Sequence, residues 1–199
     1  MKDGTLLEGE FKNDKVHGMA LVREPDGTQY IGRFSEGKRQ GIGCLNNKTY
    51  QFVGRFENGQ PGAKGVFEYG TGHIHKGEFK NGKLQGFGVI ENQKDGSFLR
   101  GDFVDGVLDG YGQDIISQDK YYEGNFVKGV RSGIGKIHDK AGFGYQGEFK
   151  DGKPHGFGIE SSTDKYVYAS TDESGNKIGD ALIIEGGQNT VGTFVDGKL

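Results

Sequence analysis

The chain has 199 residues, a formal net charge of −3 at pH 7 and a pI near 6.0. This balance gives no overall basic signal, which argues against nucleic acid as a partner. A single cysteine, Cys44, excludes an internal disulfide framework and fits a reducing compartment. The sequence shows no signal peptide and no apolar run long enough to span a membrane, so we expect a cytoplasmic protein.

The hydrophobic fraction of 32% is low, yet the 14 Phe, 9 Tyr and 39 Gly recur mostly at fixed intervals. A short word of the type Tyr-x-Gly-Glu-Phe returns every 22 to 24 residues, and a further copy lies near the end of the chain. Its glycine stands at Gly9, Gly32, Gly54, Gly77, Gly101, Gly124, Gly147 and Gly192. A fixed period of this length indicates a repeat array, with eight recognisable repeats and one degenerate repeat.

Each repeat is predicted to form one β-hairpin. In residues 122–126, Tyr122, Gly124 and Phe126 fall on one face of a strand, because side chains alternate. Residues 127–129 then form a turn, and a second strand begins near Gly133. Asp-Gly pairs such as Asp26-Gly27 and Asp95-Gly96 are hairpin signals that connect one repeat to the next. The fold class is therefore all-β: an elongated, single-layer, twisted antiparallel meander with no sustained helical period.

Two repeats early in the chain depart from the pattern. In the first, Asp14 stands where later repeats carry a turn glycine such as Gly37. In the third, the segment 61–65 has Ala63 in place of the first glycine of the usual Gly-x-Gly pair, and a local distortion is expected there.

Residues 1–160 comprise seven regular repeats. Residues 161–199 continue the same array with one degenerate and one incomplete repeat. In the degenerate repeat, Tyr168, Ser170 and Asp172 are aligned with the usual Tyr, Gly and Phe, and the charged Asp172 is expected to weaken the core. The last hairpin stops after its first strand and turn. This predicts either that the chain continues beyond Leu199 or that its open edge pairs end to end with a second copy.

The repeated word resembles the MORN repeat, whose pattern is roughly Tyr-x-Gly-Glu-Phe/Trp-x-x-Gly-x-x-x-Gly-x-Gly. The resemblance extends over nearly all of the chain. MORN repeats occur in scaffold proteins, junctional membrane proteins, lipid kinases and some lysine methyltransferases, so the resemblance implies the fold more strongly than one function.

No combination of residues indicates catalysis, and neither a metal nor a cofactor is expected. The segment 142–147 spells GxGxxG but lacks the following helix that a dinucleotide site needs. His73 and His75 share a strand face without further ligands, and surface histidines at a turn are the better interpretation. The glycosylation sequon at residues 47–49 follows no secretory signal.

The repeated aromatic residues are the candidate binding site for a protein partner. Two interpretations remain open: these rings form the core alone, or they form the core and also line a groove that takes a helix or an extended peptide. The candidate residues are Tyr30, Phe34, Phe52, Phe56, Phe79, Phe103, Tyr122, Phe126, Tyr145 and Phe149.

The predicted function is a non-enzymatic scaffold or adaptor that binds a partner segment along this groove. The first alternative is the accessory half of a SET-domain lysine methyltransferase, because residues 175–199 resemble the segment that links MORN repeats to that catalytic domain. The second is a tether to a membrane or the cytoskeleton. For this alternative, turn cations such as Lys12, Lys15, Lys38, Arg39, Lys80, Lys83, Lys150 and Lys153 would bind anionic lipid weakly.

Overall fold

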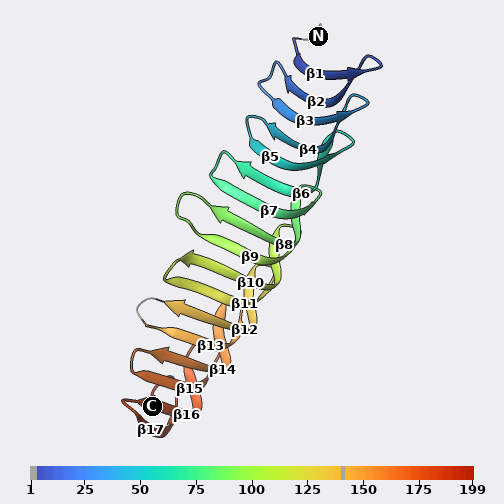
Figure 1. The fold of residues 1–199 in the computed structure, drawn as a ribbon. Helices are drawn as coiled ribbons and strands as arrows, with labels where there is room; N and C mark the ends of the chain where they lie inside the picture. Colours follow the sequence, from blue (N-terminus) through green and yellow to red (C-terminus); the bar gives the residue numbers. More distant parts are fainter. Residues whose placement is uncertain (1–3, 140–141) are drawn as a thin grey trace. The chain divides into compact units, whose positions relative to one another are not determined.

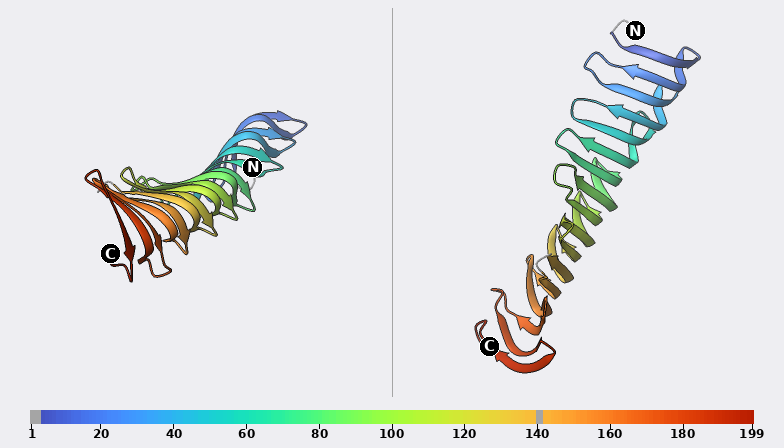
Figure 2. Two further views of the ribbon diagram at one scale, coloured as in Figure 1. Left: turned by 90° about the horizontal axis from the view of Figure 1, so that it is seen from below. Right: turned by 60° about the vertical axis from the view of Figure 1, so that its left-hand side comes forward.

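A computed structural model describes residues 4–139 and 142–199, and every regular element in it is a β-strand. The chain forms two compact units, Met1–Lys94 and Asp95–Leu199. In each unit, successive antiparallel strands lie side by side in a single layer (Figures 1 and 2). The predicted all-β meander of antiparallel hairpins is confirmed, whereas the predicted boundary at residues 160/161 stays a prediction.

The strands of the first unit are β1 (Leu6–Lys12), β2 (Lys15–Arg23), β3 (Gln29–Ser35), β4 (Lys38–Asn46), β5 (Tyr50–Glu57), β6 (Gln60–Tyr69), β7 (His73–Lys80) and β8 (Lys83–Asn92). Those of the second are β9 (Phe98–Val104), β10 (Val107–Ser117), β11 (Lys120–Val127), β12 (Val130–Asp139), β13 (Gly144–Lys150), β14 (Lys153–Ser162), β15 (Lys165–Thr171), β16 (Lys177–Glu185) and β17 (Gln188–Phe194). None of the described residues forms a helix of the length and apolarity needed to cross a membrane.

The tight turn inside each of the seven regular repeats has two consecutive residues with positive φ. In the sixth repeat these are Lys128 (φ 49°) and Gly129 (φ 81°), at the predicted position. Two positive φ angles define the type I′ turn, whose twist matches that of the flanking strands. In the first repeat, Asp14 adopts φ 57° in place of the usual glycine, so this turn keeps its geometry with two side chains.

The second strand of each regular repeat contains a bulge next to the Gly-x-Gly position, also in the third repeat, which carries Ala63 there. In the second repeat Gly32 pairs with Gly43, and Phe34 pairs with Arg39. The two pairs are thus two residues apart on β3 but four residues apart on β4. The additional residues are accommodated because Gly41 adopts φ 74°, a conformation that side chains resist.

The core of a repeat is an aromatic ring that lies over two glycines. The Tyr30 ring occupies the space above Gly32 on its own strand and above Gly43 on the neighbouring strand, where any β-carbon would overlap it. It makes edge-to-face contacts with Phe34 and Phe56, and its hydroxyl donates to the Arg33 carbonyl oxygen at 3.2 Å. One ring therefore covers a glycine of its own strand and a glycine of the neighbouring strand.

The same arrangement recurs in the sixth repeat. Here Tyr122 covers Gly124 and Gly135, and its hydroxyl donates to the Asn125 carbonyl oxygen at 2.9 Å. Burial raises the pKa of Tyr122 to about 12. Its hydroxyl therefore stays protonated and continues to donate over the physiological pH range.

The predicted alignment of the degenerate repeat is wrong by one residue. Gly158 pairs with Ala169, so Ala169 occupies the glycine position that was assigned to Ser170. Val167 and Thr171 accordingly stand at the Tyr and Phe positions, and both are buried. The small core of this repeat consists of Val167, Ala169, Ala181 and Ile183, with Phe194 packed against it. Because a shift of one residue exchanges the two faces of a strand, the shifted alignment assigned Tyr168, Ser170 and Asp172 to the core face in place of Val167, Ala169 and Thr171.

Asp172 lies just after β15 and forms a turn instead of weakening a core. Its carboxylate accepts the backbone N–H groups of Ser174 at 2.8 Å and Asn176 at 2.9 Å. These hydrogen bonds lower the pKa of the Asp172 carboxyl, and the bond from the Asn176 N–H makes the largest contribution. The charged residue therefore stabilises the connection to β16.

The face opposite the aromatic core carries exposed charged residues such as Glu10, Glu78 and Glu148. In the first unit, however, this face also carries an apolar row that sequence analysis missed. Cross-strand pairing places Leu21, Ile31, Cys44, Val53 and Val66 side by side, and Ile31 is 54% exposed.

We expect Gly43→Ala to destabilise the first unit by about 1–3 kcal/mol, because the added methyl group overlaps the buried Tyr30 ring. The matched control is Gly70→Ala, since no neighbouring atom lies within 4 Å of a β-carbon placed there. The control should change stability by less than about 0.5 kcal/mol. Urea unfolding of both variants measures the difference, and equal losses would contradict the ring-over-glycine arrangement.

Candidate functional site

The structure places all ten predicted groove aromatics in the interior. Phe52, Phe56 and Tyr122 are completely buried, and the other seven are at most 8% exposed. Each belongs to the buried core of its unit. The Tyr145 and Phe149 rings, for example, are in edge-to-face contact at 5.2 Å between their centroids. Partner binding by these ten residues stays a prediction, and apart from Phe79 the groove described below is lined by other side chains.

A groove lies in the first unit beside the third repeat, with a volume of about 830 Å³. This size is within the range of small-molecule and peptide pockets. Its aromatic lining consists of Tyr50, Phe67, Tyr69 and Phe79, of which only Phe79 was among the predicted residues. Its remaining lining comes from the turns and from the start of β6: Glu57, Asn58, Gln60, Pro61, Gly62, Ala63, Asn81 and Gly82.

The groove opens where the third repeat departs from the pattern. In the first, second, fifth and sixth repeats the glycine at this position pairs with the next repeat's Phe, as Gly41 does with Phe56. In the third repeat Ala63 stands at that position without positive φ, and the pairing of β6 with β7 stops at Lys64 and Glu78. The predicted local distortion is therefore confirmed, and its result is a gap between two neighbouring hairpins.

A second difference lies at the turns. The turn glycine of one repeat usually donates to a carbonyl oxygen of the preceding repeat, as Gly59 does to Arg39 at 3.0 Å and Gly152 to Arg131 at 3.0 Å. Within the part of the chain that the structure describes, Gly82 makes no such bond to Pro61. The two turns are therefore not tied together at this point, and the groove lies between them.

The aromatic lining forms a connected cluster. Phe67 contacts Tyr50 at 5.2 Å and Phe79 at 4.8 Å between ring centroids, and it stacks on Tyr69 at 6.1 Å with an interplanar angle of 15°. Because Tyr50, Phe67 and Tyr69 are only partly buried, the cluster offers aromatic surface to a ligand. Burial raises the pKa of Tyr69, and the nearby Tyr50 adds to this shift.

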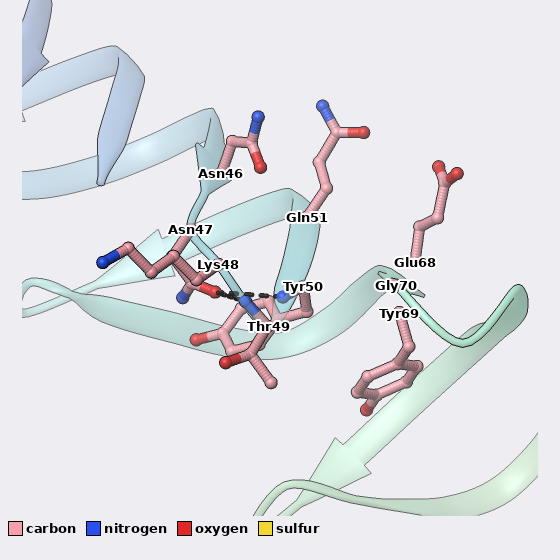
Figure 3. Close-up of a pocket in the computed structure, with 9 residues that line it drawn as sticks. All are labelled: Asn46, Asn47, Lys48, Thr49, Tyr50, Gln51, Glu68, Tyr69 and Gly70. Atoms are coloured by element: carbon pink, nitrogen blue, oxygen red, sulfur yellow. Dashed lines mark hydrogen bonds between the residues drawn. The ribbon is translucent and has the colours of Figure 1, made fainter. Parts of the chain in front are cut away.

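A smaller pocket of about 230 Å³ adjoins the cluster on the side of the loop at residues 46–51 (Figure 3). Tyr50 and Tyr69 line both cavities, and their rings lie on the side of the strands opposite to Gln51 and Glu68 (Figure 3). The Asn47 carboxamide oxygen accepts the backbone N–H groups of Thr49 at 2.8 Å and Tyr50 at 2.9 Å. These bonds hold the loop, so the position of Tyr50 is fixed.

His75 supports the cluster from β7. Its ring contacts the Tyr69 ring at 4.8 Å, and Phe67 is its cross-strand partner. Burial, followed by the proximity of His73, lowers the pKa of His75. His73 itself lies within hydrogen-bonding distance of the Thr71 hydroxyl, at 3.1 Å. Among residues 4–139 and 142–199 no group of three or more His, Cys, Asp or Glu side chains could hold a metal ion.

The charges of the groove and of the turns differ. Glu57 is the only charged residue in the groove lining, and its ion pair with Arg55 at 3.5 Å is exposed. Three of the predicted lipid-binding cations are ion-paired within the protein: Lys15 with Glu36, Arg39 with Glu24, and Lys150 with Glu173. These pairs reduce the positive charge that the turns can offer to an anionic surface.

Comparison with known proteins agrees with the repeat architecture. A family profile for the MORN repeat matches residues 8–28, 30–46, 52–74, 75–93, 100–113, 122–142 and 145–165, which is more than half of the chain. The chain belongs to the MORN-repeat family, as the resemblance of its repeated word predicted.

Two relatives place these repeats in a longer context. The chain is 30% identical to human Alsin over 133 residues, which cover 61% of this chain and 8% of Alsin. It is 33% identical to the mouse ALS2 C-terminal-like protein over 91 residues, which cover 43% of this chain and 10% of that protein. The matched region thus spans a tenth or less of either relative.

We expect the stability of the first unit to fall as the pH drops below 6.5, the ordinary pKa of histidine. Since the folded state lowers the pKa of His75, the unfolded chain takes up the proton first. His75→Phe should lose less stability than the wild type between pH 7.5 and pH 5, as measured by urea unfolding. His73→Asn is the matched control and should keep most of the pH dependence, because burial is the larger cause of the shift. An identical pH dependence in wild type and His75→Phe would contradict this assignment.

Proposed function

We propose that this chain is a non-enzymatic MORN-repeat scaffold that binds a segment of a partner protein in the groove of its first unit. The observation that carries this proposal is the cluster of Tyr50, Phe67 and Tyr69, which is connected, partly exposed and flanked by a cavity of about 830 Å³. Aromatic residues in such cavities supply much of the binding energy of protein interfaces.

The sheet itself supports this role. The rings of the groove stand on strands that are paired on at least one side, so little conformational entropy is lost when a ligand binds. The similarity to Alsin and to the ALS2 C-terminal-like protein suggests a non-catalytic repeat region within a larger protein. Cytoplasmic localisation, pairing with a second copy and attachment to a SET domain remain predictions.

A tether to anionic lipid is the weaker proposal. It relies on the turn cations, and Lys15, Arg39 and Lys150 already have carboxylate partners. The groove has no cation in its lining and therefore offers no positive charge to a phosphate group.

Selection from a random peptide-display library against the chain tests the proposed function. We expect the enriched peptides to lose at least about tenfold in affinity for Tyr69→Ala, since an aromatic hot spot is worth more than 1.4 kcal/mol. The matched control is Tyr111→Ala, because Tyr111 belongs to the second unit, is 53% exposed and is not one of the residues that line the groove. Circular dichroism and thermal unfolding confirm that both variants fold. If no enriched peptide depends on Tyr69 in the folded variant, the proposal is wrong.

A further inference from the structure

Apart from the Glu57 carboxylate, the polar side chains around the groove are able to donate hydrogen bonds. Hydroxyl groups come from Tyr50 and Tyr69, and carboxamides come from Asn58, Gln60 and Asn81. In the described part of the chain none of these five side chains hydrogen-bonds to another protein group, although the backbone N–H of Asn58 donates to Gln40. The groove thus combines an aromatic floor with unused donors around it.

This combination selects a ligand with many exposed acceptors. The backbone carbonyl groups of an α-helix are already bonded inside the helix, so a helix would leave most of these donors unused. A polyproline II segment has no internal hydrogen bonds and exposes its carbonyl oxygens, while proline residues contribute no N–H groups. Its pyrrolidine rings can also pack flat against aromatic rings. Proline-rich ligands bind to other aromatic-lined grooves in this way.

The charge of the groove adds one further requirement. Glu57 is its single charged residue, and its contact with Arg55 is exposed on both sides, at 65% and 61%. An exposed pair of this kind contributes less than about 1 kcal/mol, so an incoming cation can replace Arg55. A basic residue next to the prolines would satisfy the carboxylate.

We propose that the ligand of the groove is an extended, proline-rich segment that carries an arginine or lysine positioned to meet Glu57. This inference rests on the proposed function and specifies the chemistry of the partner. The prolines lie on Tyr50, Phe67 and Tyr69, the free hydroxyl and carboxamide groups donate to the segment's carbonyl oxygens, and the basic residue contacts Glu57.

Fluorescence polarisation with the full chain and three labelled synthetic peptides tests the inference. The first peptide is proline-rich with one arginine, the second has alanine in place of each proline, and the third is an amphipathic helix former of equal length and charge. The first peptide should bind at least tenfold more tightly than the other two. Tyr69→Ala should weaken it at least tenfold, whereas Tyr111→Ala should leave it unchanged.

The contribution of charge is tested separately. Glu57→Gln should weaken the arginine peptide severalfold and have no effect on a version with a neutral residue at that position. Glu36→Gln, which alters an exposed turn carboxylate of the second repeat, is the matched control and should have no effect. An equal loss for the charged and neutral peptides would overturn the assignment of Glu57.

The outcomes separate this inference from the proposed function. If the helical peptide binds in a Tyr69-dependent manner and the proline-rich peptide does not, the scaffold function stands and the present inference is wrong. The inference is also wrong if the proline-rich peptide binds equally well to Tyr69→Ala. If none of the three peptides binds, while display selection yields Tyr69-dependent peptides of another composition, the groove takes a ligand of different chemistry.

Discussion

The fold depends on one interaction, the placement of a large side chain over two paired glycines. In the second, third, sixth and seventh repeats this side chain is the first aromatic residue of the repeated word, as Tyr145 is over Gly147 and Gly158. Where the first aromatic is missing, a leucine from the second strand takes over: Leu84 lies against Gly77, and Leu108 against Gly101 and Gly112. In these six repeats the small paired residues are constant, and the side chain that fills the space above them varies. Alanine takes one of the glycine positions in the first repeat, where Gly9 pairs with Ala20, and Ala169 does so in the degenerate repeat. A single-layer sheet obtains a packed core in this way without a second layer.

The same rule explains where a partner can bind. An aromatic ring that fills the space above the glycines is buried in the core and has no surface left for a partner. Tyr30, Phe52 and Tyr122 are accordingly almost completely buried. Binding surface arises when a repeat carries aromatic residues beyond this requirement. The third repeat does so with Phe67 and Tyr69 on its second strand. It also lacks the positive-φ glycine, and the pairing of β6 with β7 stops at Lys64 and Glu78. Additional rings and a missing glycine thus produce the groove jointly.

Much of the fold could be predicted from the sequence, because its signals are local and repeated. The alternation of Tyr122, Gly124 and Phe126 and the turn at Lys128-Gly129 identify the hairpin directly. The degenerate repeat was misaligned because its core positions hold Val167, Ala169 and Thr171. These residues lack the aromatic signature, so only the cross-strand pairing reveals their register. The apolar row with Ile31 and Val53 was missed because five neighbouring strands must be aligned before it can be recognised.

The candidate site was predicted only in part, for a physical reason. The anomaly at Ala63 can be recognised in the sequence, but the predicted partner-binding residues were the aromatics that recur. Recurrence in a repeat protein selects residues that satisfy the same packing requirement in every repeat, which means the core. Residues that occur in one repeat only, such as Phe67 and Tyr69 in the repeat that contains Pro61, are absent from the consensus pattern of the repeats. The consensus therefore does not reveal them as binding residues. A binding site in such an array is therefore expected where one repeat differs from the others. What can bind there depends on the aromatic surface and the free hydrogen-bond donors that this repeat exposes.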